Sequence, residues 1–236
     1  MYVTTSCDEP HCAEVLAMQH EQKAPSKNLP AGSYLYYEGD TVAYLYLIKS
    51  GVVRLTRVLE DGRRQVIAFG YPGDIVGFPA SGCHHTDCDA LVETRLQLIK
   101  RTYLDDAGTN PTMHRALLEA AMHEISAMQD HFMMLGRKCA PEKVASFLKT
   151  LVERCCDANS RDITVDLPMS RTDIADFLGL TTETVSRCFT ALRKDGVIRL
   201  KGVHRVEVLS WAALEARASG DKDGPEDRPD RLLFVA

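Results

Sequence analysis

The segment from Ser170 to Ile198, SRTDIADFLGLTTETVSRCFTALRKDGVI, constrains the fold more than any other part of the chain. Ser170 is suited to cap a first helix, with Asp173 three positions later as its acidic partner in a capping box. Gly179 tolerates the positive φ of a tight turn, and Thr181 is suited to cap a second helix. The spacing therefore predicts a helix-turn-helix.

The second predicted helix has one apolar face and one polar face. Its apolar side chains recur at helical spacing, at Val185, Cys188, Phe189 and Leu192. The opposite face carries Glu183, Ser186, Arg187 and Thr190. Arginine offers a planar fork to guanine, glutamate accepts from cytosine, and serine is small enough to touch a base or a phosphate. This face suits the major groove of DNA, with Glu183, Ser186 and Arg187 reading bases; the alternative is an ordinary helical pair with a solvated polar face.

A β-hairpin is predicted directly after the second helix. Following Gly196, the sequence VIRLKGVHRVEVL alternates as two strands around a turn at Lys201 to His204. Two helices followed by such a hairpin are typical of a winged helix. We expect the DNA backbone to be contacted from the helix starts and the wing, by Ser170, Arg171, Thr181, Thr182, Thr190, Lys201 and His204.

Composition favours two modest domains with a local DNA-binding surface. The chain has 236 residues, 45% of them hydrophobic, which is enough for two cores. A net charge of -5 argues against non-specific binding of polyanions. No apolar run approaches the roughly 20 residues of a membrane span, and the first residues lack the features of a signal peptide. We therefore expect a cytoplasmic protein with no membrane partner.

The N-terminal half predicts a β-structure. Glycines recur beside turn-forming residues at positions 39, 51, 62 and 73, and the stretches between them are rich in β-branched and aromatic residues. This spacing suits a β-roll or jelly roll. The expected fold class is α+β. The expected domains are an N-terminal arm (1–28), the β-roll (29–110), a dimerisation helix (111–138), a winged helix-turn-helix (139–214) and a disordered tail (215–236).

The long helix carries an apolar seam with alternating spacings of three and four residues. The seam consists of Leu118, Ala121, Ile125, Met128, Phe132 and Leu135. Such a heptad pattern predicts pairing with a second copy, and helix-turn-helix proteins usually read two half-sites as dimers. The alternative is a helix that packs only on its own domain.

With β-roll, long helix and winged helix in that order, the chain resembles the superfamily of the cyclic-AMP receptor and the fumarate-nitrate regulator, bacterial transcription factors. The resemblance covers roughly Leu29 to Trp211. Its most specific part is LGLTTETVSR, where Glu183, Ser186 and Arg187 match the E-x-x-S-R signature of the FNR and FixK branch. The resemblance implies a homodimer on a palindrome close to TTGAT, four spacer bases, ATCAA. It also implies a contact with RNA polymerase at the turn Asp61, Gly62, Arg63 and Arg64, which is otherwise a solvated loop.

Cyclic-AMP binding is not expected. Nucleotide-binding members of this superfamily hold the ligand with a Gly-Glu pair and an Arg-Ser pair. Here Gly77 is followed by Phe78, and the later region contains Asp87 and Asp89. Acids at the position of a phosphate-pairing arginine would repel the ligand.

The cysteines leave several interpretations open. Oxygen-sensing members carry an iron-sulfur cluster on four cysteines, and Cys7, Cys12, Cys83 and Cys88 form an irregular candidate set. Zinc with His84 or His85, a haem, or a cupin-like metal enzyme using Cys83, His84 and His85 are further alternatives. The remaining interpretation is a polar loop with incidental thiols. We expect no cofactor and no enzymatic activity, with a cluster as the main alternative.

Cys188 is a candidate redox residue because it adjoins Arg187. Oxidation there would add charge or bulk close to the DNA phosphates. Its helical phase, however, points it inward with Val185 and Phe189, where a cysteine behaves as an inert apolar group.

A different class of function is an effector-binding module whose winged domain contacts proteins; such a protein would dimerise without binding any duplex.

Overall fold

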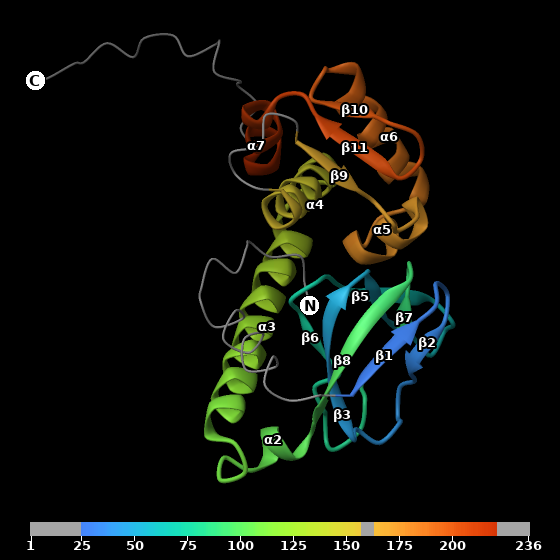
Figure 1. The fold of residues 1–236 in the computed structure, drawn as a ribbon. Helices are drawn as coiled ribbons and strands as arrows, with labels where there is room; N and C mark the ends of the chain where they lie inside the picture. Colours follow the sequence, from blue (N-terminus) through green and yellow to red (C-terminus); the bar gives the residue numbers. More distant parts are fainter. Residues whose placement is uncertain (1–24, 157–162, 221–236) are drawn as a thin grey trace, which may run out of the picture.

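The computed structural model describes residues 25–156 and 163–220 of the chain. A β-rich domain comes first, a long helix runs beside it, and a smaller, mostly helical domain completes the fold (Figure 1). The expected α+β class and the order of β-roll, long helix and winged helix are confirmed.

Two antiparallel four-stranded sheets build the β-roll. The first has the order β1 (Ser26–Leu29), β8 (Thr94–Lys100), β3 (Tyr44–Ser50) and β6 (Ile75–Val76). The second has the order β2 (Tyr34–Tyr36), β7 (Asp87–Ala90), β4 (Val53–Val58) and β5 (Arg64–Gly70). Their apolar sides share one core, which includes Ile48, Val53 and Leu96. The first strand begins three residues before the predicted start of the domain.

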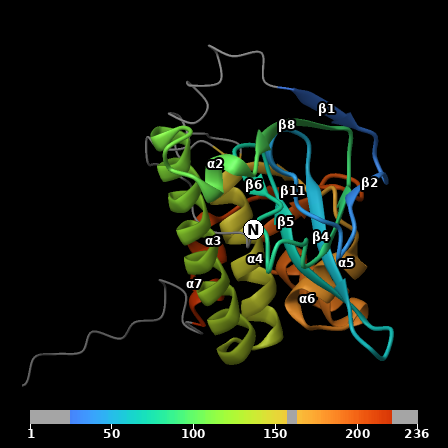
Figure 2. The same ribbon diagram turned by 90° about the horizontal axis from the view of Figure 1, so that it is seen from below.

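A long helix follows the short helix α2 (Thr102–Asp105). It is α3 (Pro111–Arg137), and it begins with proline at its first position and with Asn110 as its cap, whose side chain accepts from the Met113 amide at 3.0 Å. The inner face of α3 uses Met113 and Leu117 to cover the β-roll. Figure 2 shows α3 along one margin of the molecule. The helix therefore has a packed face and an outer face.

The C-terminal domain is a winged helix. Its elements are α4 (Ala140–Cys155), β9 (Thr164–Asp166), α5 (Arg171–Leu178), α6 (Thr182–Lys194), β10 (Ile198–Leu200), β11 (Arg205–Val208) and α7 (Trp211–Ser219). The predicted hairpin is β10 and β11, and the unpredicted β9 adds a third strand beside β11. The tail predicted from residue 215 is wrong as far as Ser219, because Leu214 and Ala218, four residues apart, anchor α7 in the core. Residues 221–236 lie outside the described residues.

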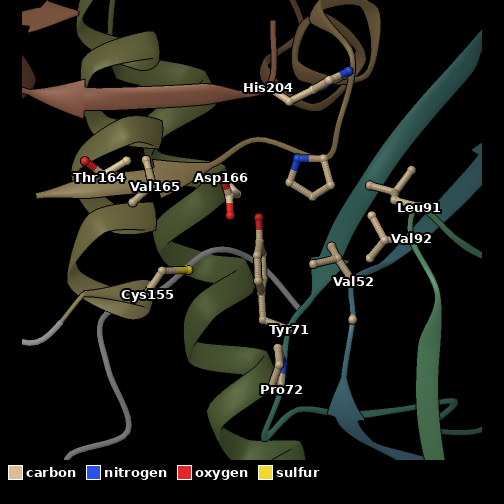
Figure 3. Close-up of a pocket in the computed structure, with 12 residues that line it drawn as sticks. Val52, Tyr71, Pro72, Leu91, Val92, Cys155, Thr164, Val165, Asp166 and His204 are labelled. Atoms are coloured by element: carbon tan, nitrogen blue, oxygen red, sulfur yellow. The ribbon is translucent and has the colours of Figure 1, made fainter. Parts of the chain in front are cut away.

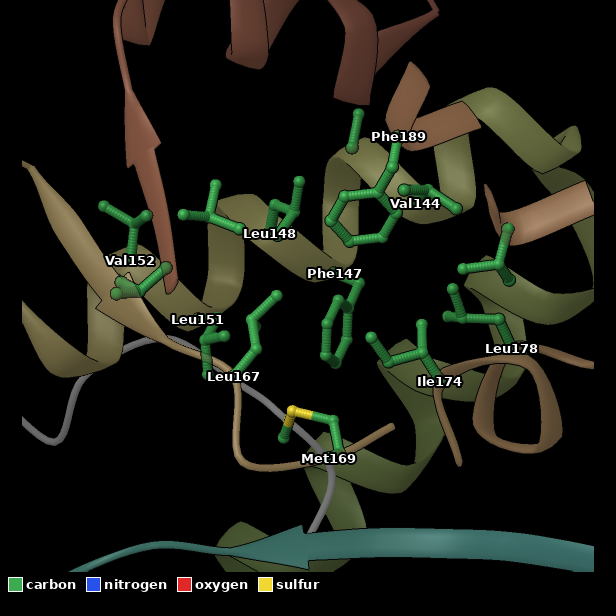
Figure 4. Close-up of a cluster of buried hydrophobic side chains, with 14 of the residues drawn as sticks. Val144, Phe147, Leu148, Leu151, Val152, Leu167, Met169, Ile174, Leu178 and Phe189 are labelled. Carbon is green, nitrogen blue, oxygen red and sulfur yellow. The ribbon is translucent and has the colours of Figure 1, made fainter. Parts of the chain in front are cut away.

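The two domains share a continuous apolar core. Phe69 of the β-roll contacts Phe147 of α4 and Phe177 of α5, with ring centroids 6.5 and 5.3 Å away. Figure 4 shows Phe147 among aliphatic side chains of α4 and α5, Leu167 and Met169 of the segment after β9, and the Phe189 ring of α6. Because buried aromatic rings contribute strongly to stability, this cluster fixes the helix-turn-helix against the β-roll.

A buried ion network joins the same two domains. Arg54 of β4 binds Asp89 of β7 with two hydrogen bonds, at 3.1 and 2.8 Å, and also binds Asp173 of α5. Arg64 of β5 reaches Asp173 and Asp176 of α5, each at 2.7 Å. Hydrogen bonds from Ser170 and the charge of Arg54 lower the pKa of Asp173 despite its burial. The carboxylate is therefore charged at neutral pH and ties α5 to the β-roll.

We expect the fold to become less stable as the pH decreases, because His131 of α3 is buried in its neutral form. The ring is 8% exposed and stacks on Phe177 at 4.2 Å, and burial lowers its pKa to about 4, aided by the charge of Lys143 and opposed by a hydrogen bond to the Phe177 backbone. As pH drops from about 6.5 to 4, the unfolded chain takes up a proton that the folded chain refuses. The free energy of unfolding should therefore decrease by about 2 kcal/mol over this window.

Chemical denaturation of the wild type and of His131→Phe at pH 7.5, 5.5 and 4.5 measures this effect. Phenylalanine preserves a ring against Phe177 but cannot bind a proton. The variant should lose part of the pH slope between 6.5 and 4, and equal slopes in the two proteins would contradict the assignment.

Candidate nucleic-acid interface

The turn between α5 and α6 has the geometry that the sequence predicts. The Ser170 hydroxyl accepts from the Asp173 amide at 3.1 Å, and the Asp173 carboxylate accepts from the Ser170 amide at 3.0 Å. Gly179 ends α5 with φ of 61°, and the Thr181 hydroxyl accepts from the Thr184 amide at 3.2 Å to begin α6. These caps set the direction of α6 relative to the rest of the domain.

Helix α6 presents its polar face to solvent. Val185, Cys188, Phe189 and Leu192 are buried in the core, as the spacing predicts. Glu183 and Arg187 are exposed at 73% and 78% of their side chains, and they form an ion pair at 2.6 Å across one helical turn. Exposed ion pairs of this kind contribute little to stability. The Arg187 guanidinium therefore lies on the helix surface and is not packed into the core.

The rest of this face is polar and stays close to the helix. The Ser186 hydroxyl donates to the Thr182 carbonyl at 2.8 Å, and the Thr190 hydroxyl donates to the Ser186 carbonyl at 2.9 Å. A shallow hollow of about 480 Å³ runs over Glu183, Ser186, Arg187, Thr190, Ala191 and Lys194. Lys194 was missed in the sequence, although its position four residues after Thr190 places it on the same face.

The start of α5 supplies a second cation. The Arg171 guanidinium lies over the Phe189 ring at 3.3 Å, and burial lowers its pKa to about 10, so it remains charged. Its buried Nη1 atom has no hydrogen-bond partner within the described residues. Thr182 at the start of α6 lies beside α5, with its hydroxyl 3.4 Å from that of Thr172. The starts of both helices are thus close to one another.

The wing places its two predicted contact residues differently. Lys201 is exposed near the turn, with its ammonium 3.4 Å from Glu207. The His204 ring turns back toward the body of the protein, where Nδ1 lies 3.0 Å from the Leu167 carbonyl, and it lines a cleft beside the β-roll. The residue is nevertheless exposed, so its expected contact with the DNA backbone stays a prediction. The nearby Leu167 carbonyl, which no local pattern reveals, fixes the ring.

The outer face of α3 is apolar and exposed. Ile125 and Phe132 of the predicted seam are 48% and 75% exposed, and Leu118 and Met128 are exposed as well. Ala121 and Leu135 are half-buried. Two exposed side chains outside the predicted spacing, Met122 and Met133, widen the apolar strip. A strip of this extent on a helix is typical of a protein interface.

In the turn from Asp61 to Arg64, some side chains are exposed to solvent and one binds the other domain. Asp61 and Arg63 are exposed and pair with each other at 2.7 Å around Gly62. Arg64 instead points to α5, where it binds Asp173 and Asp176. Two buried or half-buried acids of the other domain thus bind its guanidinium, and its assignment to a polymerase surface stays a prediction.

Three aromatic rings stack on one another in the β-roll. His84 is buried and stacks on Tyr36, with ring centroids 3.5 Å apart and planes at 5°. Tyr36 in turn stacks on Tyr46 at 5.9 Å. Asp89, one of the two acids noted in the sequence, is bound by Arg54.

The cysteine and histidine candidates for metal binding are directed to separate partners. Cys88 is fully buried, and burial raises its pKa to about 12; Cys83 is half-buried in a short bridge to Thr41. The His85 ring contacts the Arg57 guanidinium at 3.0 Å, whereas His84 stacks inside the β-roll. Within residues 25–156 and 163–220, no three histidine, cysteine or acidic side chains are gathered as metal ligands. Cys7 and Cys12 lie outside the described residues.

Cys188 is buried on the inner face of α6. It is 7% exposed, and burial raises the pKa of its thiol. The protonated thiol is a poor nucleophile, so the structure favours the packing role that the helical phase predicts over a redox role.

A winged helix whose polar recognition face is solvent-exposed, joined to a β-roll by a long helix with an apolar outer face, defines a DNA-binding regulator with a sensor-type domain. Family models agree with each half of this description. Residues 142–217 match the Crp-like helix-turn-helix domain, and residues 26–107 match the cyclic nucleotide-binding domain. None of the described helices is long and apolar enough to cross a membrane.

Curated relatives match over most of the chain. The nitrogen fixation regulation protein FixK of Bradyrhizobium diazoefficiens is 38% identical over 90% of this chain and 89% of its own length. The transcriptional activator protein FnrL of Cereibacter sphaeroides is 34% identical over 94% of this chain and 90% of its own. The solved structure of FixK2 from Bradyrhizobium japonicum superposes with a TM-score of 0.75 at 34% identity, covering 82% of this chain and 96% of that chain. This chain belongs to the CRP/FNR family of transcription regulators, in its FixK-like and FNR-like branch.

Proposed function

We propose that this regulator binds, as a homodimer, a palindrome close to TTGAT, four spacer bases, ATCAA. The observation that carries the proposal is the exposed face of α6, where Glu183, Ser186 and Arg187 stand together with their side chains free of the core. Arg187 reads guanine, Glu183 reads cytosine, and Ser186 contacts a base or phosphate. One subunit occupies each half-site.

The DNA backbone is held by residues around this face. Arg171 and Lys201 supply positive charge at the start of α5 and on the wing, and Lys194 adds a cation at the end of the hollow on α6. The caps Ser170 and Thr181, together with Thr182 and Thr190, offer amide or hydroxyl donors along the same surface. His204, exposed at the end of the wing turn, is a further backbone contact.

The dimer forms through the outer face of α3. A paired α3 buries Leu118, Ile125, Met128 and Phe132 against their counterparts, with Ala121 and Leu135 at the margin and Met122 and Met133 beside them. Pairing holds two α6 helices about 34 Å apart, the separation of successive major grooves on one side of the duplex.

The protein acts without a cyclic nucleotide. The rings of His84, Tyr36 and Tyr46 stack in the β-roll. Asp89 lies in the region where nucleotide-binding members carry a phosphate-pairing arginine, and here Arg54 is bound to this carboxylate. No cofactor is required for the DNA-binding conformation. The iron-sulfur alternative depends on Cys7 and Cys12 with Cys83 and Cys88, of which Cys88 is enclosed in the core.

The exposed turn Asp61, Gly62 and Arg63 is the surface we assign to RNA polymerase in an activating complex. It lies at the β4–β5 hairpin tip, next to Val58 and Leu59, whose apolar side chains are exposed. A charged, apolar-edged hairpin of this kind suits a protein contact.

A mobility-shift assay with aerobically purified protein tests ligand independence. The protein should shift the palindrome at the same concentration with and without cyclic AMP, and anaerobic reconstitution with iron and sulfide should not improve binding. A requirement for the nucleotide, or for iron, would overturn this part of the proposal; in the second case Cys7, Cys12, Cys83 and Cys88 become the ligands to replace.

A further inference from the structure

A cleft of about 750 Å³ lies between the β-roll and the winged helix. Val52, Tyr71 and Val92 form its β-roll wall, and Val165, Asp166 and His204 form the wall from the DNA-binding domain (Figure 3). Its volume is within the range of small-molecule sites, about 300 to 1,000 Å³. We propose that this cleft binds a small uncharged molecule with an apolar body and one hydroxyl group.

The apolar walls of the cleft indicate that the ligand has an apolar body. Val52, Leu91 and Val92 come from two turns of the β-roll, and Val165 faces them from β9. Pro72 and the ring of Tyr71 extend the same apolar surface. Burying an aromatic or aliphatic body here removes apolar area from water on both sides, which favours binding.

The hydroxyl of Tyr71 indicates that the ligand carries a polar group. This residue is 5% exposed, yet its phenolic oxygen has no hydrogen-bond partner within the described residues. Figure 3 shows the oxygen directed across the cleft toward the Asp166 carboxylate. A buried hydroxyl left without a partner is unfavourable, so the site is complete only when a polar atom lies between these two groups.

The groups around that point accept hydrogen bonds. Asp166 offers carboxylate oxygens, which accept hydrogen bonds. The Tyr71 hydroxyl donates. A ligand hydroxyl satisfies this arrangement because it accepts from Tyr71 and donates to Asp166.

Charge in the cleft excludes an ionic ligand. Asp166 is already paired with Arg205 at 2.6 Å, so a cation gains little there. None of the described residues that line the cleft is a lysine or an arginine, so an anion finds no cationic partner on its walls. Arg154, which lies over the Tyr71 ring at 5.2 Å, is bound to Asp74.

Titration of the full-length protein with 2-naphthol, followed by its fluorescence, tests the proposal. We expect one saturable site per chain, at least tenfold weaker binding of naphthalene, which lacks the hydroxyl, and at least tenfold weaker binding of 2-naphthoate, which is an anion. These three probes need no variant and are unaffected by any folding defect. Absence of saturable 2-naphthol binding, or an equal or stronger affinity for either comparison compound, would overturn the proposal.

Two tyrosine variants locate the site. Tyr71→Phe removes only the phenolic oxygen and should weaken 2-naphthol binding by about five- to tenfold, the loss expected for one hydrogen bond. Tyr34→Phe, at an exposed tyrosine of β2 outside the cleft, is the matched control and should bind as the wild type does. Thermal denaturation of both variants verifies that they are folded. Unchanged affinity in folded Tyr71→Phe would show that 2-naphthol binds elsewhere and would contradict the assignment.

Discussion

Ile125→Glu should convert the dimer to a monomer and lower the affinity for the palindrome by on the order of 100-fold or more. Ile125 lies at the middle of the exposed apolar strip of α3. In a paired helix the two introduced carboxylates would face an apolar seam and each other, and a buried, unpaired charge is strongly destabilising. A single subunit then contacts one half-site only and loses the gain of binding two sites at once.

Sedimentation equilibrium and a mobility shift on the same preparation measure both effects. The matched control is His123→Glu, which adds the same charge at an exposed position of α3 two residues away, on a different side of the helix. The control should remain dimeric and bind the palindrome normally. A dimer that persists in Ile125→Glu would mean that the strip covers something other than a second copy.

Arg187→Ala should lower the affinity for the palindrome by about 1 to 3 kcal/mol and relax the preference at the guanine position. The side chain is 78% exposed and pairs only across one turn of α6, so its removal leaves the core of the domain unchanged. The loss therefore reports a base contact rather than a folding defect. Binding to unrelated duplex should change far less.

Lys201→Ala is the comparison for Arg187→Ala. Lys201 is an exposed cation on the wing, and as a phosphate contact it should weaken binding to all duplexes alike. Its removal should also reduce the slope of log affinity against log salt by about one. Titrations of the palindrome and of a scrambled duplex at three salt concentrations separate the two behaviours. Equal losses on both duplexes for Arg187→Ala would defeat the base-reading assignment.

Local sequence signals predicted the helix-turn-helix well. The capping pair Ser170 and Asp173, the turn at Gly179 and the cap at Thr181 all act within a few residues of their own positions, and the structure reproduces each of them. The inward phase of Cys188 follows from helical periodicity in the same way. Features that depend on neighbours in sequence are therefore accessible without a structure.

Contacts between distant segments were not predicted. Arg64 binds acids more than 100 residues away, and the Leu167 carbonyl holds His204, so neither orientation follows from a local pattern. Strand β9 has three residues and exists because β11 pairs with it. Met122 and Met133 lie outside the heptad spacing, and only the packing of α3 on the β-roll shows that they are exposed.

The most direct test of the central claim is the ratio of affinities for two palindromes at physiological salt. One carries TTGAT, four spacer bases, ATCAA; the other has the same half-sites with nine spacer bases. Five added base pairs rotate one half-site by about half a turn, so a dimer with its α6 helices held about 34 Å apart no longer reaches both. We expect the longer spacer to lower the affinity on the order of 100-fold, toward that of a single half-site. Equal affinity for the two duplexes would contradict symmetric recognition by a homodimer.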